Sequence, residues 1–489
     1  MAITRSTVKT IAIIGGGFSG TITAVNLARF SESPLRVCLI NRGYPVGRGV
    51  AYSTRQVEHL LNVAARNMSA LADHPHHFVE WLQTRSEYAE VPEAELRETY
   101  VPRRVFGDYL RGLLLRYWRP TEAGARVRIE IVDDEAVDIL PREHGADVLL
   151  AGGTTIEADK VLLATGNQPP AEMPTAAAGF HHPRYVENPW QDWSSRLPDK
   201  SEPVVLLGAG LTMVDAFLTL QAHGWQGPLT AVSRHGILPL SHFRGIEYAD
   251  FPPPGVATLR LKELVELVEE HCGRLRGLGA NPAIVVDKLR PHTQRVWQNL
   301  SLDEKREFCR LHAARWNVTR HRIAQQIHQR LSTAIADGAL RVVKGSICGL
   351  HGTGQGVGVV VEHAPGRQRT IEAGLVINCT GPCASFSAVA APLLQKLLGS
   401  GRVQVDALDM GVEIEADFAV VEPDGSRSSC LYAMGPLVKG VLWETTAVPE
   451  LRSQAFRVAQ VLLDELSADQ RAVEAWPIQP EVEVLEYCI

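Results

Sequence analysis

The chain has 489 residues and a formal net charge of −6, from 49 lysine and arginine and 55 aspartate and glutamate residues. A chain of this length is too long to fold around a single hydrophobic core, so we expect about two to four domains. Acidic and basic residues are mixed along the sequence. This mixing excludes the basic surface of a nucleic-acid-binding or membrane-binding protein and leaves small molecules as the expected partners.

The sequence contains neither a signal-peptide pattern nor an apolar stretch long enough for a bilayer, so we expect a soluble, cytoplasmic protein with reduced thiols. Cys379 and Cys383 can be a redox pair or two buried thiols beside a turn. The lack of a C-x-x-C disfavours a disulfide reductase. His74, His76 and His77 match no ligand pattern, so no metal is predicted.

The first predicted unit is a strand, a glycine turn and a helix. An apolar run, Ile11 to Ile14, leads into the G-x-G-x-x-G segment that spans residues 15–20, and a helix-compatible segment follows. Gly15 allows a tight turn, Gly17 lets the backbone approach a pyrophosphate, and Gly20 lets the helix pack closely on the strand. The helix N-terminus offers free N–H groups. A dinucleotide site is therefore predicted here.

The next strand, Val37 to Ile40, ends at Asn41, where a ribose-binding carboxylate usually stands. Asparagine can hydrogen-bond a ribose hydroxyl but lacks the charge, so we expect a weaker contact. Further on, Asp159 to Leu163 predicts another strand, which ends in Ala164-Thr165-Gly166.

A second strand, turn and helix begins at Val204, after a linker rich in proline and tryptophan. Gly208 and Gly210 are in place, but Met213 replaces the third glycine, so we expect a looser or shifted nucleotide site. The strand that follows ends in Ser233-Arg234. These side chains can bind a 2′-phosphate, which favours NADPH over NADH; the alternative is an ordinary surface arginine.

Residues 257–336 have a helical pattern that contains Trp316, Arg320 and Arg322. The two arginines belong either to a solvated basic helix face or to an anion site. After the helical region the sequence predicts several strands, the last of which leads into a second Thr-Gly-Pro segment near residue 380. Residues 482–489 alternate between apolar and polar enough to form an edge strand.

The strings GRGVAYST (47–54), LLNVAARNMSAL (60–71), PRRVFGDYL (102–110) and GAGLTMVD (208–215) resemble the FAD/NAD(P)-binding flavoproteins with two dinucleotide-binding domains. That family is related to the class B flavin monooxygenases, which include N-hydroxylating enzymes. The W-x-x-x-R-H-R pattern at 316–322 and the segment 430–455, with a helix starting near Pro449, resemble the same family.

The resemblance implies an α/β fold with two Rossmann-like dinucleotide-binding domains, the second inserted in the first and carrying a helical insertion. The expected division is an FAD-binding domain at 1–196 and 381–489, and an NAD(P)H-binding domain at 197–380 with helices at about 256–336.

The resemblance also implies two sets of cofactor-binding residues. The first set, expected to bind FAD, is Gly15, Gly17, Phe18, Ser19, Gly20, Asn41, Arg42, Arg48, Gly49, Asn62, Met68, Thr165, Gly166, Gly435, Glu444, Thr445 and Thr446. The second set, expected to bind NADPH, is Gly208, Gly210, Leu211, Thr212, Ser233 and Arg234. Met68 can equally be a core residue.

The implied activity is that of an FAD-dependent, NADPH-using monooxygenase that hydroxylates an amine nitrogen of a small, amino-acid-like substrate. It would use molecular oxygen through a flavin C4a-hydroperoxide. Arg320 and Arg322 are the candidate clamp for a substrate carboxylate. The alternatives are an NAD(P)H-dependent flavin reductase or dehydrogenase without oxygen insertion, and a non-catalytic flavin-binding protein.

Overall fold

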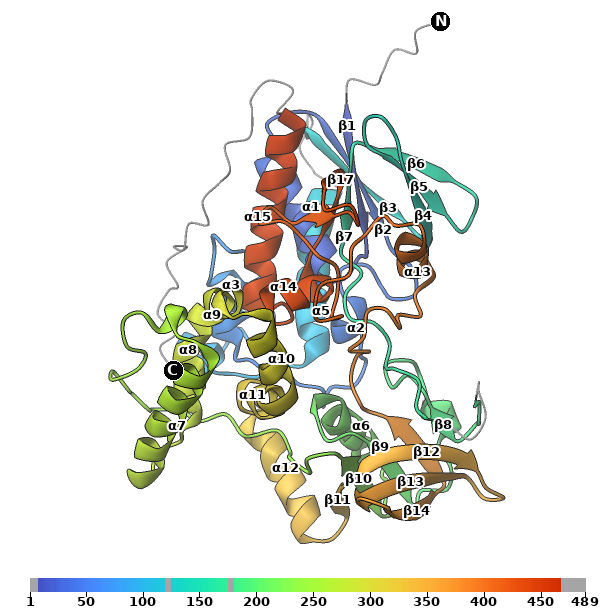
Figure 1. Ribbon diagram of the computed structural model, residues 1–489, viewed down its shortest axis with the longest axis vertical. Coiled ribbons are helices and arrows are strands. Elements are labelled where there is room, and N and C mark those ends of the chain that lie inside the picture. The colour runs from blue at the N-terminus through green and yellow to red at the C-terminus, as the bar shows by residue number, and fades with distance from the viewer. Residues whose placement is uncertain (1–7, 119–124, 175–179, 468–489) are drawn as a thin grey trace, which may run out of the picture.

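The structure, a computed structural model, describes residues 8–118, 125–174 and 180–467. Two mainly parallel sheets lie at opposite ends of the molecule, and a group of helices lies beside the second one (Figure 1). The predicted α/β fold with two Rossmann-like units is confirmed. The predicted edge strand at 482–489 lies outside the described residues. Within the described residues, no helix combines the length and apolar character that a bilayer crossing requires.

The first sheet has the strand order β16-β17-β7-β1-β2-β3, and only its edge strand β16 runs antiparallel to its neighbour. The strands are β1 (Lys9–Ile14), β2 (Leu35–Ile40), β3 (Val127–Val132), β7 (Lys160–Leu163), β16 (Ala419–Val421) and β17 (Arg427–Ala433). The central strands are apolar throughout because both faces of the sheet are covered; Ile11 and Ile13 are fully buried.

Three helices cover one face of this sheet: α1 (Phe18–Phe30), α5 (Arg103–Trp118) and α15 (Val448–Ser467). On the other face lie α13 (Pro392–Gly399) and an antiparallel sheet of β4 (Ala136–Pro141), β5 (Ala146–Leu150) and β6 (Thr155–Ala158). Helices α1 and α15 pack side by side, where the rings of Phe30 and Phe456 meet edge to face. Short helices at the rim are α2 (Gly49–Tyr52), α3 (His77–Gln83), α4 (Glu93–Arg97) and α14 (Lys439–Leu442).

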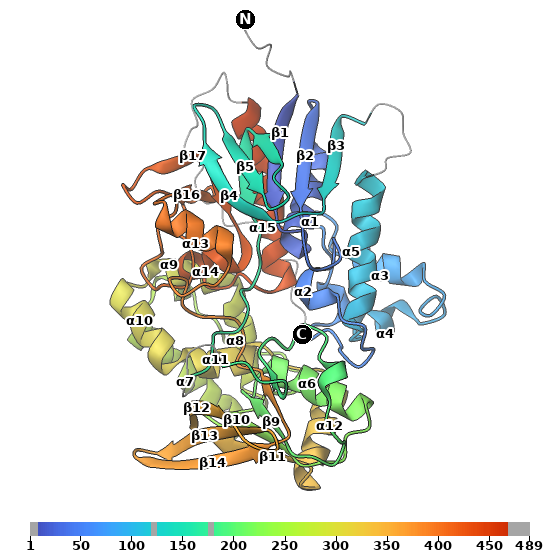
Figure 2. The same ribbon diagram turned by 90° about the vertical axis from the view of Figure 1, so that its right-hand side faces the viewer.

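The second sheet has the strand order β11-β10-β9-β15-β8 and is parallel throughout. Its strands are β8 (Tyr185–Val186), β9 (Val204–Leu207), β10 (Leu229–Ser233), β11 (Leu340–Lys344) and β15 (Leu375–Asn378). Helices α6 (Leu211–Ala222) and α12 (Gln325–Ala336) pack on one face. The antiparallel strands β12 (Ser346–Gly352), β13 (Val357–Ala364) and β14 (Arg367–Ala373) pack on the other. Figure 2 shows β1, β2 and β3 at one end and β9 to β14 at the other.

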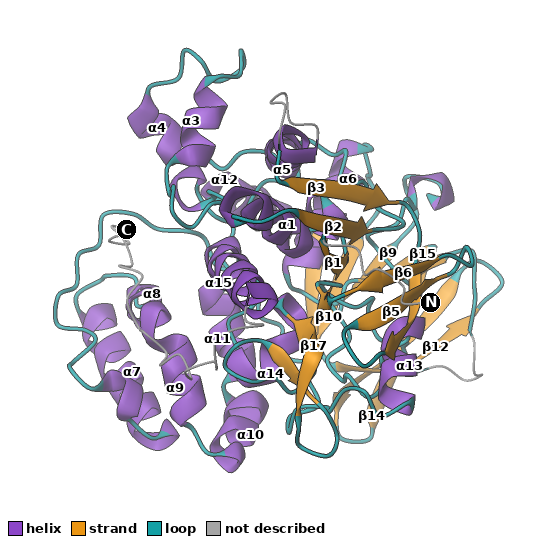
Figure 3. Ribbon diagram, turned by 90° about the horizontal axis from the view of Figure 1, so that it is seen from above, coloured by secondary structure: helices purple, strands orange, loops and turns teal. Residues whose placement is uncertain are grey.

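The predicted helical region is present between β10 and β11. Besides α12 it contains α7 (Leu261–Gly277), α8 (Ala283–Leu289), α9 (Thr293–Asn299), α10 (Leu302–Leu311) and α11 (Ala313–Arg320). Helices α7 to α10 gather on one side of the molecule, away from the strands (Figure 3). We name residues 256–322 the helical insertion.

Strands of the first sheet come from both ends of the described chain, and all strands of the second sheet lie between them in sequence. The exact division at residues 196 and 380 stays a prediction. The short strand β8 precedes the first of these positions and pairs with β15 of the second sheet.

Candidate functional site

The first glycine turn lies at the carboxyl end of β1, between the ends of β2 and β7. Gly15 has a φ of +114° and donates its N–H to Ile40 O at 2.9 Å. A Cβ at Gly15 would overlap the carbonyl oxygen of Ala164, and a Cβ at Gly20 would overlap that of Gly15. Helix α1 then starts after Gly17 without a side-chain cap or an acidic residue in its first turn. These features fit the pyrophosphate of a dinucleotide, because the helix N-terminus stays open to an anion.

The second glycine-rich loop lies directly against the first. Gly47 donates its N–H to Gly16 O at 2.8 Å, and a Cβ at Gly49 would lie 2.8 Å from Gly17 Cα. Arg48 forms an ion pair with Asp108, while its Nε is buried without a partner among the described residues. Two of the predicted FAD-binding residues are therefore next to the first turn.

The side-chain amide of Asn41 stabilises the first glycine turn through hydrogen bonds. Its Oδ1 accepts from Gly16 N–H at 3.1 Å and its Nδ2 donates to Tyr44 O at 2.8 Å. Both ends of the amide are thus engaged by the protein, and any ribose contact must use the remaining hydrogen or lone pair. The neighbouring Arg42 lies 3.5 Å from Glu135 in an exposed pair.

Two further segments with predicted FAD-binding residues follow strands β17 and β7 of the same sheet. A Cβ at Gly435 would lie 3.3 Å from Ser19 Oγ at the start of α1, so the segment after β17 borders the turn. Thr165 and Gly166 follow β7 after Ala164, and the hydroxyl of Thr165 is buried without a hydrogen-bond partner among the described residues. Met68, 2% exposed, is a member of the hydrophobic core.

The remaining predicted FAD-binding residues differ in exposure. Phe18, at 7% exposed, belongs to the first core, and Asn62 lines a small cavity together with Arg103 and Asp215. In the closing segment Glu444 and Thr445 are buried, whereas Thr446 is exposed. None of these roles in FAD binding is tested by the geometry alone, and they stay predictions.

The second glycine turn repeats the geometry of the first. Gly208 has a φ of +111°, donates its N–H to Val232 O at 2.7 Å, and would overlap Cys379 O if it carried a Cβ. Helix α6 starts after Gly210 without a side-chain cap, and the space beside Gly210 is open. Met213, in place of a third glycine, is fully buried in the second core. The backbone geometry of the turn is therefore retained, and the bulky side chain points into the core.

The end of β10 carries the residues predicted to recognise a 2′-phosphate. Arg234 is exposed, and the Ser233 hydroxyl accepts from Gly236 N–H at 3.0 Å. Strand β11 pairs Lys344 with Ser233, so a second exposed cation lies at the same edge. The sequence alone did not single out Lys344, because the pairing of β10 with β11 joins residues more than a hundred positions apart. Leu211 and Thr212 lie in the first turn of α6 and are partly buried.

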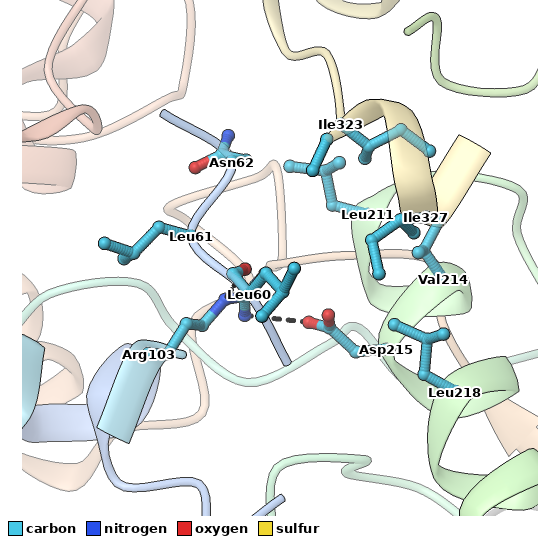
Figure 4. Close-up of a pocket in the computed structure, with 11 residues that line it drawn as sticks. Leu60, Leu61, Asn62, Arg103, Leu211, Val214, Asp215, Leu218, Ile323 and Ile327 are labelled. Carbon is cyan, nitrogen blue, oxygen red and sulfur yellow. Dashed lines mark hydrogen bonds and ion pairs between the residues drawn. The ribbon is translucent and has the colours of Figure 1, made fainter. Parts of the chain in front are cut away.

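A buried ion pair joins the two halves of the molecule, which are the nucleotide-binding units built on the first and the second sheet. Arg103 at the start of α5 contacts Asp215 of α6 at 2.8 Å, with side-chain exposures of 12% and 8% (Figure 4). His59 Nε2 lies 3.0 Å from Asp215 O and 2.9 Å from Thr219 Oγ1, and burial lowers the pKa of His59. Sequence reasoning missed these residues as partners, although Arg103 and Asp215 each lie in a string that carries the family resemblance.

A second contact between the halves is made by His242. Its Nε2 lies 2.8 Å from Asn62 O, and a carbonyl only accepts, so Nε2 carries the proton. Burial and then the positive charges of Arg322, Arg320 and Arg66 lower the pKa of His242 to about 4. The imidazole is therefore neutral at physiological pH.

Arg320 and Arg322 are each 6% exposed, which excludes the solvated basic helix face. Arg322 Nη2 donates to Asp287 at 2.6 Å. Arg320 lies between two carboxylates, 3.8 Å from Glu444 Oε2 and 3.6 Å from Glu450 Oε1. Both guanidinium groups already face carboxylates of this chain, and a role as a substrate clamp stays a prediction.

The two cysteines considered as a redox pair are free thiols. Cys379 is buried in the second core, and burial raises its pKa. Cys383 Sγ donates to Ser385 O at 3.3 Å. A raised pKa disfavours the thiolate that disulfide exchange requires, so Cys379 fits a structural role.

Glycine turns of the dinucleotide-binding type thus lie at the carboxyl ends of strands in both sheets. A sequence model of the family described as FAD-NAD(P)-binding matches residues 12–168, so this part of the chain carries an FAD/NAD(P)-binding domain. A comparison with curated proteins gave no match.

Solved structures of two ornithine hydroxylases and a lysine monooxygenase share the fold over nearly the whole chain. The reduced form of the ornithine hydroxylase PvdA from Pseudomonas aeruginosa matches with a TM-score of 0.63 at 15% identity, over 94% of this chain and 100% of that chain. The ornithine N-hydroxylase KtzI from Kutzneria sp. 744, with reduced FAD, NADP+ and L-ornithine, matches with 0.61 at 16%, over 95% and 100%. The lysine monooxygenase NbtG from Nocardia farcinica matches with 0.53 at 17%, over 92% and 100%. The chain therefore has the fold of flavin-dependent oxidoreductases.

Proposed function

We propose that this protein is an FAD-dependent, NADPH-using monooxygenase that hydroxylates an amine nitrogen of a small, amino-acid-like substrate with molecular oxygen. The observation that carries the proposal is the repeated glycine turn. Gly15 and Gly208 have the same left-handed backbone and make the same contact to the neighbouring strand. One chain can thus hold an electron donor and a flavin together.

The first turn fits FAD. The open N-terminus of α1 would hold the pyrophosphate, the loop of Arg48 and Gly49 lies against it, and the buried Thr165 hydroxyl lacks a protein partner among the described residues. FAD, when bound, supplies the hydride acceptance and oxygen chemistry that amino-acid side chains lack.

The second turn fits a nicotinamide dinucleotide with a 2′-phosphate. The N-terminus of α6 would hold the pyrophosphate, and Arg234 with Lys344 would face the 2′-phosphate at the end of the adjacent strands. The similarity to ornithine and lysine hydroxylases supports an amine as substrate. A dry site would keep that amine neutral, which attack on oxygen requires.

The proposal is tested by anaerobic titration with NADPH and NADH while flavin absorbance near about 450 nm is followed. We expect NADPH to bleach the flavin. On admission of oxygen with ornithine, lysine or other amines, we expect NADPH consumption with hydroxylamine formation.

Bleaching without any hydroxylated product would favour the reductase alternative. Flavin that NADPH cannot reduce would favour a non-catalytic flavin-binding protein. Arg234→Ala should weaken NADPH binding by about ten- to a hundredfold and leave NADH unchanged, because one charge-assisted hydrogen bond is worth about 1.5 to 3 kcal/mol. The matched control is Arg369→Ala, an exposed arginine on β14. Equal effects on both nucleotides would contradict the 2′-phosphate role.

A further inference from the structure

The helical insertion holds the segment that closes the first site. Gln294 Nε2 of α9 donates to Glu444 O at 3.0 Å, and Trp316 Nε1 of α11 donates to Glu444 Oε1 at 3.1 Å. Trp297 Nε1 donates to Gly440 O at 2.8 Å. Three side chains of the insertion therefore fix the backbone and one carboxylate between β17 and α15, far from them in sequence.

The backbone of this segment is strained where the insertion contacts it. Trp443 has a φ of +60°, a left-handed conformation that a bulky side chain rarely adopts. Its ring stacks on Trp297 with centroids 4.7 Å apart, and Phe308 meets it edge-on at 5.1 Å. Such strain persists only where surrounding contacts enforce it, and it concentrates at ligand sites.

Buried ion pairs also attach the helical insertion to the start of α15. Arg290 holds Glu450 with two hydrogen bonds of 2.7 and 2.9 Å, and Arg320 lies between Glu450 and Glu444. Burial opposes ionisation of Glu450, but Arg290 and Arg320 outweigh it and lower its pKa to about 2. The start of α15 is therefore attached to the insertion by full charges.

These contacts fix the position of Thr445, which directly follows Glu444 in the chain. It is fully buried, and its hydroxyl has no hydrogen-bond partner among the described residues. A buried hydroxyl without a partner is rare in a folded protein and points to a group that the polypeptide does not supply. The same holds for the Thr165 hydroxyl after β7.

We propose that the helical insertion is part of the FAD site: Trp316 and Gln294 are positioning residues that hold Glu444 and Thr445 against the flavin. This inference rests on the proposed binding of FAD at the first glycine turn. The insertion would then set FAD affinity and the flavin environment, besides any contact that it makes with substrate.

The test compares FAD binding to the full-length apoprotein, followed by quenching of FAD fluorescence, in wild type, Trp316→Phe and Gln294→Leu. We expect each variant to weaken FAD binding by about tenfold and to shift the visible circular dichroism band and midpoint potential of bound flavin. The matched controls are Trp193→Phe, which removes a buried indole donor to Pro189 O, and Gln221→Leu, which removes an amide contact to Arg330. Both controls should match wild type within about twofold.

Equal FAD affinity, dichroism and potential in wild type and in both variants would overturn the inference. Should Trp316→Phe fail to fold, the decision falls to Gln294→Leu, whose thermal unfolding is checked first. A wild-type protein that binds no FAD would instead refute the proposed function. An effect confined to substrate KM, with unchanged flavin spectra and affinity, would refute the positioning role and favour the substrate-clamp prediction.

Discussion

Replacing Arg103 with methionine should destabilise the contact between the two nucleotide-binding halves, because Asp215 then remains as a buried carboxylate without its cation. The two groups are 2.8 Å apart and only 12% and 8% exposed. At an effective dielectric constant of about 20, charges about 4 Å apart attract by ~4 kcal/mol. Loss of one partner of a buried pair costs about 3 to 5 kcal/mol, and we expect about 3.

Asp215→Leu should cost a similar amount by leaving Arg103 unpaired. The free-energy cost of the double variant should be about 3 kcal/mol smaller than the sum of the two single costs. The cavity around the pair is lined by Leu60, Val214 and Leu218, so it accepts two apolar side chains. The free energies come from urea unfolding followed by tryptophan fluorescence.

The control cycle uses Arg306 and Asp303, a pair with exposures of 58% and 94%, where we expect no measurable coupling. A coupling at Arg103 and Asp215 as small as that of the control would refute the view that a buried charge pair fixes the two halves.

Three further outcomes are expected. Gly15→Ala should abolish FAD binding and destabilise the protein, because the new Cβ overlaps Ala164 O at a positive φ; unchanged FAD affinity would contradict the predicted turn. Met213→Ala should lower the free energy of unfolding by about 2 to 5 kcal/mol, because this side chain is fully buried, and a loss under about 1 kcal/mol in urea would contradict its place in the core. His242 has a depressed folded pKa, so its stabilising effect is complete above about pH 6.5 and is lost as the pH falls toward about 4. His242→Gln should remove about 3 kcal/mol of that pH dependence, and parallel stability curves for variant and wild type would exclude this role.

Much of the fold could be predicted from local patterns. The strands before Gly15 and Gly208 and the helices after them follow from apolar runs and turn chemistry alone. The insertion of the second Rossmann-like unit in the first came from the family resemblance and not from local patterns. The assignment of β3 and β4 did not follow from such patterns: β3 joins the parallel sheet, whereas β4, the next strand along the chain, pairs with β5. Local alternation cannot specify which sheet a strand joins.

The glycine turns of the candidate site could be predicted, because their backbone geometry depends on local residue spacing. The contacts between side chains that are distant in sequence could not. Glycine spacing identified both turns. The pairing of Arg103 with Asp215, and of Trp316 with Glu444, joins residues over a hundred positions apart, and no local pattern encodes such partners. The sequence left Arg320 open between a solvated basic face and an anion site, because a helix of mixed polarity does not reveal that Arg320 is buried beside Glu444 and Glu450.

The position of β17 in the first sheet has a consequence for biosynthesis. Strand β17 pairs with β7, yet the ribosome makes it more than 250 residues later, after the whole second sheet, which ends at Asn378. The second sheet can therefore complete its pairing first, while β7 still presents an open apolar edge. We expect nascent chains that stop before Arg427 to need a chaperone on that edge, and FAD to be captured only once the carboxyl-terminal strand and α15 have emerged.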